Sequence, residues 1–362
     1  MSKLKIALIG NGSISESHLK AYHKNPNCKL WAICDVNEER ACKTANQYDI
    51  PHVYTDYHAL LGNPDIDAIS ICTWNNTHAE ISIAALEAGK NVLCEKPLCK
   101  TVDEALLIEE AVHRTGRLLQ VGYVRRHASN IEVLKRFIDA GDLGEIYYAK
   151  ASLLRRLGNP GGWFSDKERS GGGPLIDIGV HVIDLCWYLM GRPQVKAVKG
   201  HTYEKLGNRS HIENFSFYQA ADYDAKNNTV EDLANALITF ENGASLMVDV
   251  SFSLHARQNC SLINIYGDKG GAEIEPQLSI VTERHNTILN IDPQISHSGF
   301  DFVSSFQNEI DHFVNCCLGK EKTISPVEDG VQMTKILNAI YQSAAEGREI
   351  QFNSCEAGDQ IE

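Results

Sequence analysis

The sequence predicts an α/β protein of two domains: a doubly wound parallel sheet, then an α+β domain on a large, mostly antiparallel open sheet. Three observations support this prediction. The 362 residues exceed what one ordinary core accommodates. Short apolar runs alternate with helix-length segments in the first third of the chain. Successive long strand-like runs dominate the rest. We expect a first domain at 1–124 and a second at 125–362, whose C-terminal helix can pack back on the first.

The first domain is expected to alternate strands with helices, and right-handed crossovers between them make the sheet parallel. Each expected strand is a short apolar run, and each expected helix is longer and carries polar residues at intervals. The expected strands cover residues 5–10, 29–35, 67–73, 91–97 and 117–124. The expected helices cover residues 15–25, 37–48, 77–89 and 101–116.

The second domain is expected to build its sheet from longer runs, with the stretch FENGAS as a hairpin turn. A glycine-rich loop at 158–173 separates two of its elements. The expected strands cover residues 145–156, 194–204, 232–253 and 260–276, and the expected helices 127–141, 174–191, 300–319 and 327–347. Helices cover one face of such a sheet, and the other must be polar or buried on a partner. We therefore expect a homo-oligomer that forms through the open sheet.

Composition and charge restrict the classes of function. The chain is 43% hydrophobic and 22% charged, as soluble globular proteins are, and no apolar run approaches the ~20 residues of a membrane span. A net charge of −13 repels phosphate backbones, so we expect no nucleic-acid partner. The 11 cysteines form no C-x-x-C pair, and the N-terminus does not look like an export signal. Free thiols and a cytoplasmic location are therefore expected.

The stretch GNGSIS, which begins at Gly10, follows an expected strand and opens a helix, as a dinucleotide-binding turn does. Gly10 permits the turn, and Gly12 lets the backbone approach a pyrophosphate at the helix N-terminus. Ser15 stands where a third glycine is usual, but it is small and can bond backbone groups of the first turn. Glycine pairs also occur in other tight turns. In this context we expect a working cofactor turn, with Ser13 and Ile14 among its contacts.

Asp35 ends the second expected strand, twenty residues after Ser15. An acid at this place bonds the 2′-hydroxyl of the adenosine ribose, and its charge would repel a 2′-phosphate. No arginine or lysine follows directly, since the next residues are Val36, Asn37 and Glu38. NAD is therefore favoured over NADP. The same carboxylate is also a candidate N-cap for the following helix, and the two roles are compatible.

Two further stretches carry candidate catalytic groups. CEKPLCK places Glu95 and Lys96 at the carboxyl end of a strand, where open α/β sheets bind ligands. Asp177 and His181 lie four residues apart and share a helix face, which Asp184 also approaches. Such a polar stripe in an apolar helix is costly unless it is paired or functional. The alternative for Lys96 is an ordinary lysine at a strand end. The alternative for Asp177 and His181 is an internally paired Asp–His. No cysteine has zinc-ligand spacing, so we expect no metal.

In order and spacing, GNGSIS, Asp35, CTWNNTHAE, CEKP and GGGPLIDIGVHVID resemble the motifs of the glucose–fructose oxidoreductase/inositol dehydrogenase (Gfo/Idh/MocA) family. The resemblance extends from residue 4 to about residue 350. It implies an NAD-dependent enzyme that oxidises CH–OH groups. It also implies that Lys96 is the active-site lysine and that Asp177 and His181 are the catalytic pair.

The resemblance implies further cofactor contacts. The residues concerned are Thr73, Trp74, Asn75, His78, Glu95, Lys96 and Trp163. Trp74 replaces the proline of the family's T-P-N-x-x-H loop, so we expect a different contact there. Trp163 matches a family tryptophan near the nicotinamide, whereas Phe164 replaces the arginine that usually follows it.

The expected mechanism is reversible hydride transfer between a secondary alcohol and NAD. His181 accepts the hydroxyl proton, because an imidazole titrates near working pH. Lys96 stabilises the developing alkoxide, while Asp177 bonds the substrate hydroxyl and orients His181. Arginines and aromatic rings between residues 125 and 170 suit the hydroxyls and faces of a sugar ring. The expected substrate contacts are Lys96, Tyr123, Arg125, Arg155, Arg156, Trp163, Asp177 and His181.

The stretch from LLRRLGNPGGWF to the catalytic helix resembles that of bacterial family members that act on glucosides. We therefore expect oxidation at C3 of a glucoside to the 3-keto glucoside. An inositol or free-sugar dehydrogenase would use the same residues. A regulator that binds a dinucleotide without turnover is a further alternative, which the intact Lys96, Asp177 and His181 disfavour. The last alternative is a metal-dependent hydrolase that uses the His–Asp cluster.

Overall fold

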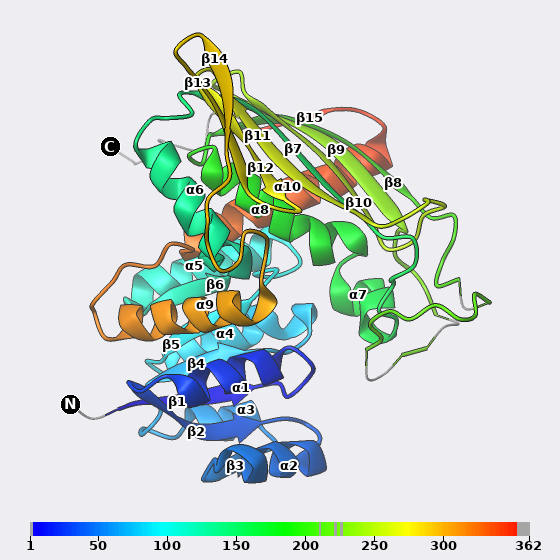
Figure 1. The fold of residues 1–362 in the computed structure, drawn as a ribbon. Helices are drawn as coiled ribbons and strands as arrows, with labels where there is room; N and C mark the ends of the chain where they lie inside the picture. Colours follow the sequence, from blue (N-terminus) through cyan, green and yellow to red (C-terminus); the bar gives the residue numbers. More distant parts are fainter. Residues whose placement is uncertain (1–2, 210, 221–222, 225–226, 353–362) are drawn as a thin grey trace, which may run out of the picture.

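The computed structural model describes residues 3–209, 211–220, 223–224 and 227–352. It contains the two sheets that the sequence predicts, one parallel and one mostly antiparallel, so the expected fold class is confirmed. In Figure 1 the six-stranded sheet and its helices (blue to cyan) lie below the nine-stranded sheet (green to yellow). Within the described part of the chain, no helix is both long and apolar enough to cross a membrane.

The six-stranded sheet has the order β3-β2-β1-β4-β5-β6, and every neighbouring pair is parallel. Its strands are β1 (Leu4–Ile9), β2 (Cys28–Cys34), β3 (His52–Tyr54), β4 (Ala68–Ile71), β5 (Asn91–Glu95) and β6 (Leu119–Gly122). Its connecting helices are α1 (Ser15–Lys24), α2 (Glu38–Tyr48), α3 (Tyr57–Leu61), α4 (His78–Glu87) and α5 (Val102–Thr115). The strand order reverses between β1 and β4, so the loops after these two strands open side by side, where such sheets bind ligands.

The nine-stranded sheet has the order β14-β13-β12-β11-β7-β10-β9-β8-β15. Its strands are β7 (Ile146–Leu154), β8 (Val195–Tyr203), β9 (Leu233–Phe240), β10 (Ser245–Ser251), β11 (Cys260–Gly267), β12 (Gly270–Glu275), β13 (Ser279–Arg284), β14 (Thr287–Ile291) and β15 (Ile350–Gln351). The pair β7–β10 is parallel, and the other pairs are antiparallel. The stretch FENGAS closes the β9–β10 hairpin as expected, with Gly243 at φ +86°.

Helices occupy the face of the nine-stranded sheet that looks toward the parallel sheet (Figure 1). They are α6 (Ser129–Asp139), α8 (Val180–Leu189) and α10 (Val327–Glu346), while the short α7 (Lys167–Ser170) lies to one side. Helix α10 packs against α5 as well as against β8, which joins the two halves of the molecule. Helix α9 (Phe302–Cys317) packs against α1.

The structure differs from the expected elements in two respects. The run expected to be one helix from residue 174 begins instead with a π-helical turn, Leu175–Gly179, and α8 starts at Val180. The strands β3, β13, β14 and β15 and the helices α3 and α7 were not expected. They are short, and β14 is exposed along most of its length. Such segments lack the apolar alternation by which a strand is recognised.

Arg126 forms a fully buried ionic network in the core. Its guanidinium contacts both carboxylate oxygens of Asp184, with an Nε–Oδ2 distance of 2.9 Å, and also Asp329. Asp184 therefore serves packing between α8 and the chain after β6. A buried carboxylate needs a charged partner, and Asp184 has Arg126 as this partner. Asp184 therefore belongs to the core network and not, as expected, to the polar stripe of Asp177.

Candidate active site

The turn after β1 has the geometry of a dinucleotide-binding turn. Gly10 has φ +89°, and a Cβ there would lie 2.6 Å from the carbonyl oxygen of Cys72. A Cβ at Gly12 would meet no atom within 4 Å, so its backbone is open to a ligand. The Ser15 hydroxyl donates to the carbonyl of Gly12 at 2.6 Å. Ser15 therefore stabilises the turn as expected in place of the third glycine.

Asp35 is held rigidly at the end of β2. Its Oδ2 accepts the backbone N–H of Asn11 at 2.7 Å, and its Oδ1 accepts that of Asn37 at 2.8 Å. Helix α2 is capped by the side chain of Asn37, so the alternative role of Asp35 as the N-cap of this helix is not the one observed. Arg40 also contacts Asp35, with an Nη2–Oδ1 distance of 2.7 Å. The open backbone at Gly12 fits the pyrophosphate of a dinucleotide, and the Asp35 carboxylate fits its adenosine ribose.

Ser13 and Ile14 occupy different environments in the same turn. The hydroxyl of Tyr218 donates to Ser13 Oγ at 2.9 Å, so the segment between β8 and β9 reaches the cofactor turn. Ile14 precedes α1, and its side chain packs against the apolar core beneath the sheet. Ile14 can therefore offer a ligand its backbone, whereas Ser13 can also offer a hydroxyl.

The loop after β4 is tied to the loop after β5. His78 is buried, and its ring nitrogens lie 2.8 Å from the carbonyl oxygen of Pro97 and 3.2 Å from that of Thr73. Burial lowers the pKa of His78 below its ordinary value, so the ring is neutral at pH 7. His78 thus fixes the shape of the Thr73 turn from behind.

Two other residues of this loop contact the second domain. The Asn75 amide donates to the carbonyl of Ser170 at 2.7 Å and is buried. Trp74 is 41% exposed, and the guanidinium of Arg169 lies 4.6 Å from its ring centre. The residue that replaces the family's proline therefore stacks against α7 and leaves part of its ring free.

Glu95 contacts helix α1 and the backbone of Lys96. Its Oε1 lies 2.8 Å from Nε2 of the buried His18, and its Oε2 accepts the backbone N–H of Lys96 at 3.2 Å. Glu95 as a whole is 6% exposed. The structure therefore uses Glu95 to support the backbone of Lys96 from beneath the sheet edge.

Lys96 and Asp177 are brought together from the two halves of the molecule. The ammonium of Lys96 donates to the Asp177 carboxylate at 2.9 Å and to its backbone carbonyl at 2.8 Å. The two side chains are 16% and 14% exposed, so solvent screens the pair only in part. Asp177 lies in the π-helical turn, a feature that often marks functional sites. Within the described residues, the hydrogen bond of the Asp177 carboxylate joins it to Lys96, so its expected role in orienting His181 stays a prediction.

His181 begins the first turn of α8, and its ring Nδ1 has no hydrogen-bond partner among the described residues. The pKa of His181 lies well below 6.5, first because the ring is buried and then because the cations Lys96, Arg125 and Arg155 surround it. The imidazole is therefore neutral at pH 7 and able to accept a proton.

The three expected arginines lie differently. Arg125 pairs with Glu275, and Arg155 donates to the carbonyl of Gly158 at 3.1 Å. Both lower the pKa of the His181 imidazole electrostatically, which places them near that ring. Arg156 is exposed. Of the three, Arg125 and Arg155 are thus associated with the site.

The two expected aromatic contacts also differ. Tyr123 is 1% exposed and lies in the core, where the Arg126 guanidinium is 5.0 Å from its ring centre. Its hydroxyl has no partner among the described residues. Trp163 is half-buried in the glycine-rich loop and packs on Phe164, with ring centres 3.9 Å apart. Trp163 therefore presents an aromatic face near the surface, and Tyr123 does not.

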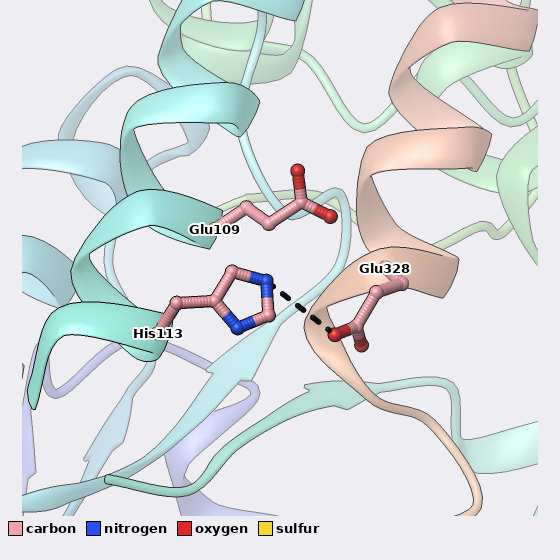
Figure 2. Close-up of side chains that lie close together, drawn as sticks. All are labelled: Glu109, His113 and Glu328. Atoms are coloured by element: carbon pink, nitrogen blue, oxygen red, sulfur yellow. Dashed lines mark ion pairs between the residues drawn. The ribbon is translucent and has the colours of Figure 1, made fainter. Parts of the chain in front are cut away.

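A group of potential metal ligands lies elsewhere, between α5 and α10. Figure 2 shows Glu109 and His113 on one helix, with the His113 ring pointing toward Glu328 on the other. The ligand atoms lie within 4.8 Å of one another, and His113 Nε2 is 3.9 Å from a Glu328 oxygen. His113 and Glu328 are both exposed. We interpret the group as a surface ion pair with a neighbouring acid.

The comparisons with known proteins agree with this geometry. Residues 4–123 match the oxidoreductase family's NAD-binding Rossmann fold, and residues 135–352 match the family's C-terminal α/β domain. The chain belongs to the Gfo/Idh/MocA oxidoreductase family. As in this family, its first domain is an NAD-binding Rossmann domain.

Among curated family members, D-glucoside 3-dehydrogenase of Escherichia coli (strain K12) is 34% identical over 97% of this chain and 98% of its own. The scyllo-inositol 2-dehydrogenase (NAD⁺) of Bacillus subtilis (strain 168) is 28% identical over 91% of each chain. The solved structure of levoglucosan dehydrogenase in complex with NADH and L-sorbose superposes with a TM-score of 0.83. It is 25% identical and covers 98% of this chain and 100% of its own.

Several residues that build this Gfo/Idh/MocA site were not expected from the sequence. Arg40 lies too far beyond Asp35 to be found by inspecting the adjacent residues. Tyr218 comes from a segment without a motif. Glu231, just before β9, accepts hydrogen bonds from the backbone N–H groups of Gly173 and Leu175. Only the three-dimensional structure brings these residues to the site.

Proposed function

We propose that this protein is an NAD-dependent dehydrogenase that oxidises the C3 hydroxyl of a D-glucoside to the 3-keto glucoside. The observation that carries the proposal is the cluster of Lys96, Asp177 and a neutral His181 at the mouth of the NAD-binding sheet. The similarity to D-glucoside 3-dehydrogenase over nearly the whole of both chains supports the choice of substrate and carbon.

His181 is the proposed general base. Its ring is neutral at pH 7, so a ring nitrogen can take the hydroxyl proton of the substrate. Lys96 stabilises the negative charge that develops on the same oxygen. Asp177 holds the ammonium in place through its carboxylate and its backbone carbonyl. The oxygen is thus activated by a base and a cation that come from different domains.

NAD supplies the electron acceptor for this oxidation when it is bound. Gly12 and the start of α1 would hold its pyrophosphate, and Asp35 its adenosine ribose. Ser13 and Ile14 would contribute further contacts from the same turn, and Thr73 and Trp74 from the loop after β4. Asn75, His78 and Glu95 act by shaping these loops.

The substrate contacts that we propose are Arg125, Arg155 and Trp163, together with the three catalytic residues. Arg125 and Arg155 lie close enough to His181 to lower its pKa. Guanidinium donors suit sugar hydroxyls, and the half-buried Trp163 offers an apolar face to a ring. Tyr123 and Arg156 would contribute only through the packing of the residues beside them.

An inositol dehydrogenase is the second candidate, favoured by the full-length similarity to scyllo-inositol 2-dehydrogenase. The test is NADH absorbance after mixing the protein and NAD with methyl β-glucoside, glucose and myo-inositol. Each reaction is repeated with a 3-keto sugar as acceptor, and the masses of the products are measured by mass spectrometry. We expect loss of two hydrogens from the glucoside at the highest kcat/KM. Faster turnover of myo-inositol selects the second candidate. NAD binding without any turnover favours a regulator.

We also propose that the protein is a cytoplasmic homo-oligomer that forms through the nine-stranded sheet. The face opposite the helices carries exposed Leu237 and Met247, which are register partners, and exposed Tyr266 beside Tyr148. Apolar side chains in register on neighbouring strands are suited to burial against a second copy. The ten cysteines of the described residues are free thiols, as in a reducing compartment. A light-scattering mass of 40.2 kDa, that of one chain, would contradict the oligomer.

A further inference from the structure

We propose that Glu231 is a positioning residue of the reaction: it anchors the start of the catalytic helix and so sets the place of Asp177 and Lys96. This inference deepens the proposed function and rests on it for the identity of the reaction. Glu231 lies outside every motif of the sequence, in the chain just before β9. It is 4% exposed, so its carboxylate must find its partners within the protein.

The Glu231 carboxylate accepts three hydrogen bonds. Its Oε2 accepts the backbone N–H of Gly173 at 2.9 Å, and its Oε1 accepts that of Leu175 at 3.2 Å. The hydroxyl of Tyr341 in α10 donates to Oε1 at 2.9 Å. Gly173 and Leu175 flank the point where the π-helical turn begins. A negative group bonded to the first N–H groups of a helix is a favourable arrangement.

The glycines before the helix are explained by this anchor. A Cβ at Gly172 would lie 2.0 Å from the Tyr341 hydroxyl oxygen, and a Cβ at Gly173 would lie 2.5 Å from the backbone oxygen of Glu231. Side chains at these positions would displace the two anchoring residues. The run GGG thus allows the backbone to approach Glu231 and Tyr341 closely, which is a role that its sequence pattern alone does not reveal.

The anchor is connected to the reacting groups by a short path. Leu175, whose N–H is held by Glu231, begins the turn that contains Asp177 two residues later. Asp177 in turn fixes the ammonium of Lys96 through two hydrogen bonds. A shift of the helix start would therefore move the charge that stabilises the alkoxide. Misplacement of a reacting group by about 1 Å can lower a rate about 10²-fold.

The matched variants are Glu231→Gln and Asp232→Asn. Asp232 is the next residue, is also buried, and also accepts backbone N–H groups, but they belong to residues 205–207. We expect Glu231→Gln to lower kcat about 10- to 100-fold with little change in KM for NAD. Asp232→Asn should lower Tm about as much as Glu231→Gln does, but it should keep kcat within about twofold of the wild-type value. Equal losses of kcat in the two variants would overturn the proposal.

A second readout does not depend on turnover. Lys96 is half-buried and held by Asp177, so mass spectrometry should show slow reaction with an amine-reactive reagent in the wild type. Glu231→Gln should raise this rate several-fold, and Asp232→Asn should not. If Glu231→Gln fails to fold, Tyr341→Phe is used in its place. It should change kcat and the reactivity of Lys96 in the same directions, but by less. Unchanged Lys96 reactivity would overturn the anchor, whereas a wild type that oxidises another alcohol would overturn only the choice of substrate.

Discussion

Replacing Lys96 by methionine is expected to lower kcat/KM by about 10²- to 10³-fold. The substitution keeps the length of the side chain but removes the charge that stabilises the substrate oxygen as it loses its proton. It also leaves the half-buried Asp177 carboxylate without its cation. The measurement is the steady-state rate of NADH formation, with binding of NAD followed separately by fluorescence.

The control for this variant is Lys135→Met, which removes a lysine that pairs with Asp139 on the surface of α6. Exposed pairs of this kind contribute little, so wild-type activity is expected. Because Lys96 helps to lower the pKa of His181, its loss should also raise that pKa. The acid limb of the pH–rate profile of Lys96→Met should move to higher pH. A profile that stays in place would show that the two residues are not electrostatically coupled.

Replacing His181 by alanine is expected to lower kcat by about 10²- to 10⁴-fold, the usual contribution of a general base. The matched control is His113→Ala, since His113 is exposed between α5 and α10 (Figure 2). The loss should be smaller at high pH, where hydroxide in solution can replace the base. A variant that retains near-wild-type turnover with the same pH dependence would exclude His181 as the base.

The wild-type pH profile gives an independent check of this assignment. A histidine of pKa 6.5 would be about three quarters protonated at pH 6. The pKa of His181 lies well below that value because of burial and three nearby cations, so the ring stays neutral and kcat/KM should remain near its plateau at pH 6. The same shift affects stability. The unfolded chain binds the proton more readily, so stability is lost as the pH falls below about 6.5.

Much of the fold is predictable from the sequence because its elements are strongly patterned. The strands β1, β2, β4 and β5 are short buried apolar runs, and the helices between them are longer and amphipathic. The hairpin of β13 and β14 was missed because it is largely exposed and lacks alternation. The π-helical turn was missed because its residues read as ordinary helix, and its geometry depends on tertiary contacts such as those of Glu231.

The candidate site was predictable in its residue types but less so in their pairings. The motifs give Lys96, Asp177 and His181, and the structure brings the first two into contact. The partner of Asp177 could not be derived, because spacing on a helix suggests His181 whereas the actual partner comes from the other domain. Asp184 was drawn into the same stripe for this reason. Long-range partners such as Glu231 leave no local signal in the sequence.

The account as a whole is tested most directly with methyl β-glucoside that carries deuterium at C3. We expect the deuterium to appear at C4 of the reduced nicotinamide, with a primary isotope effect on the single-turnover rate. Mass spectrometry and NMR of the cofactor would locate the label. Unlabelled NADH together with an oxidised sugar that still holds its deuterium would place the oxidation at another carbon and contradict the account.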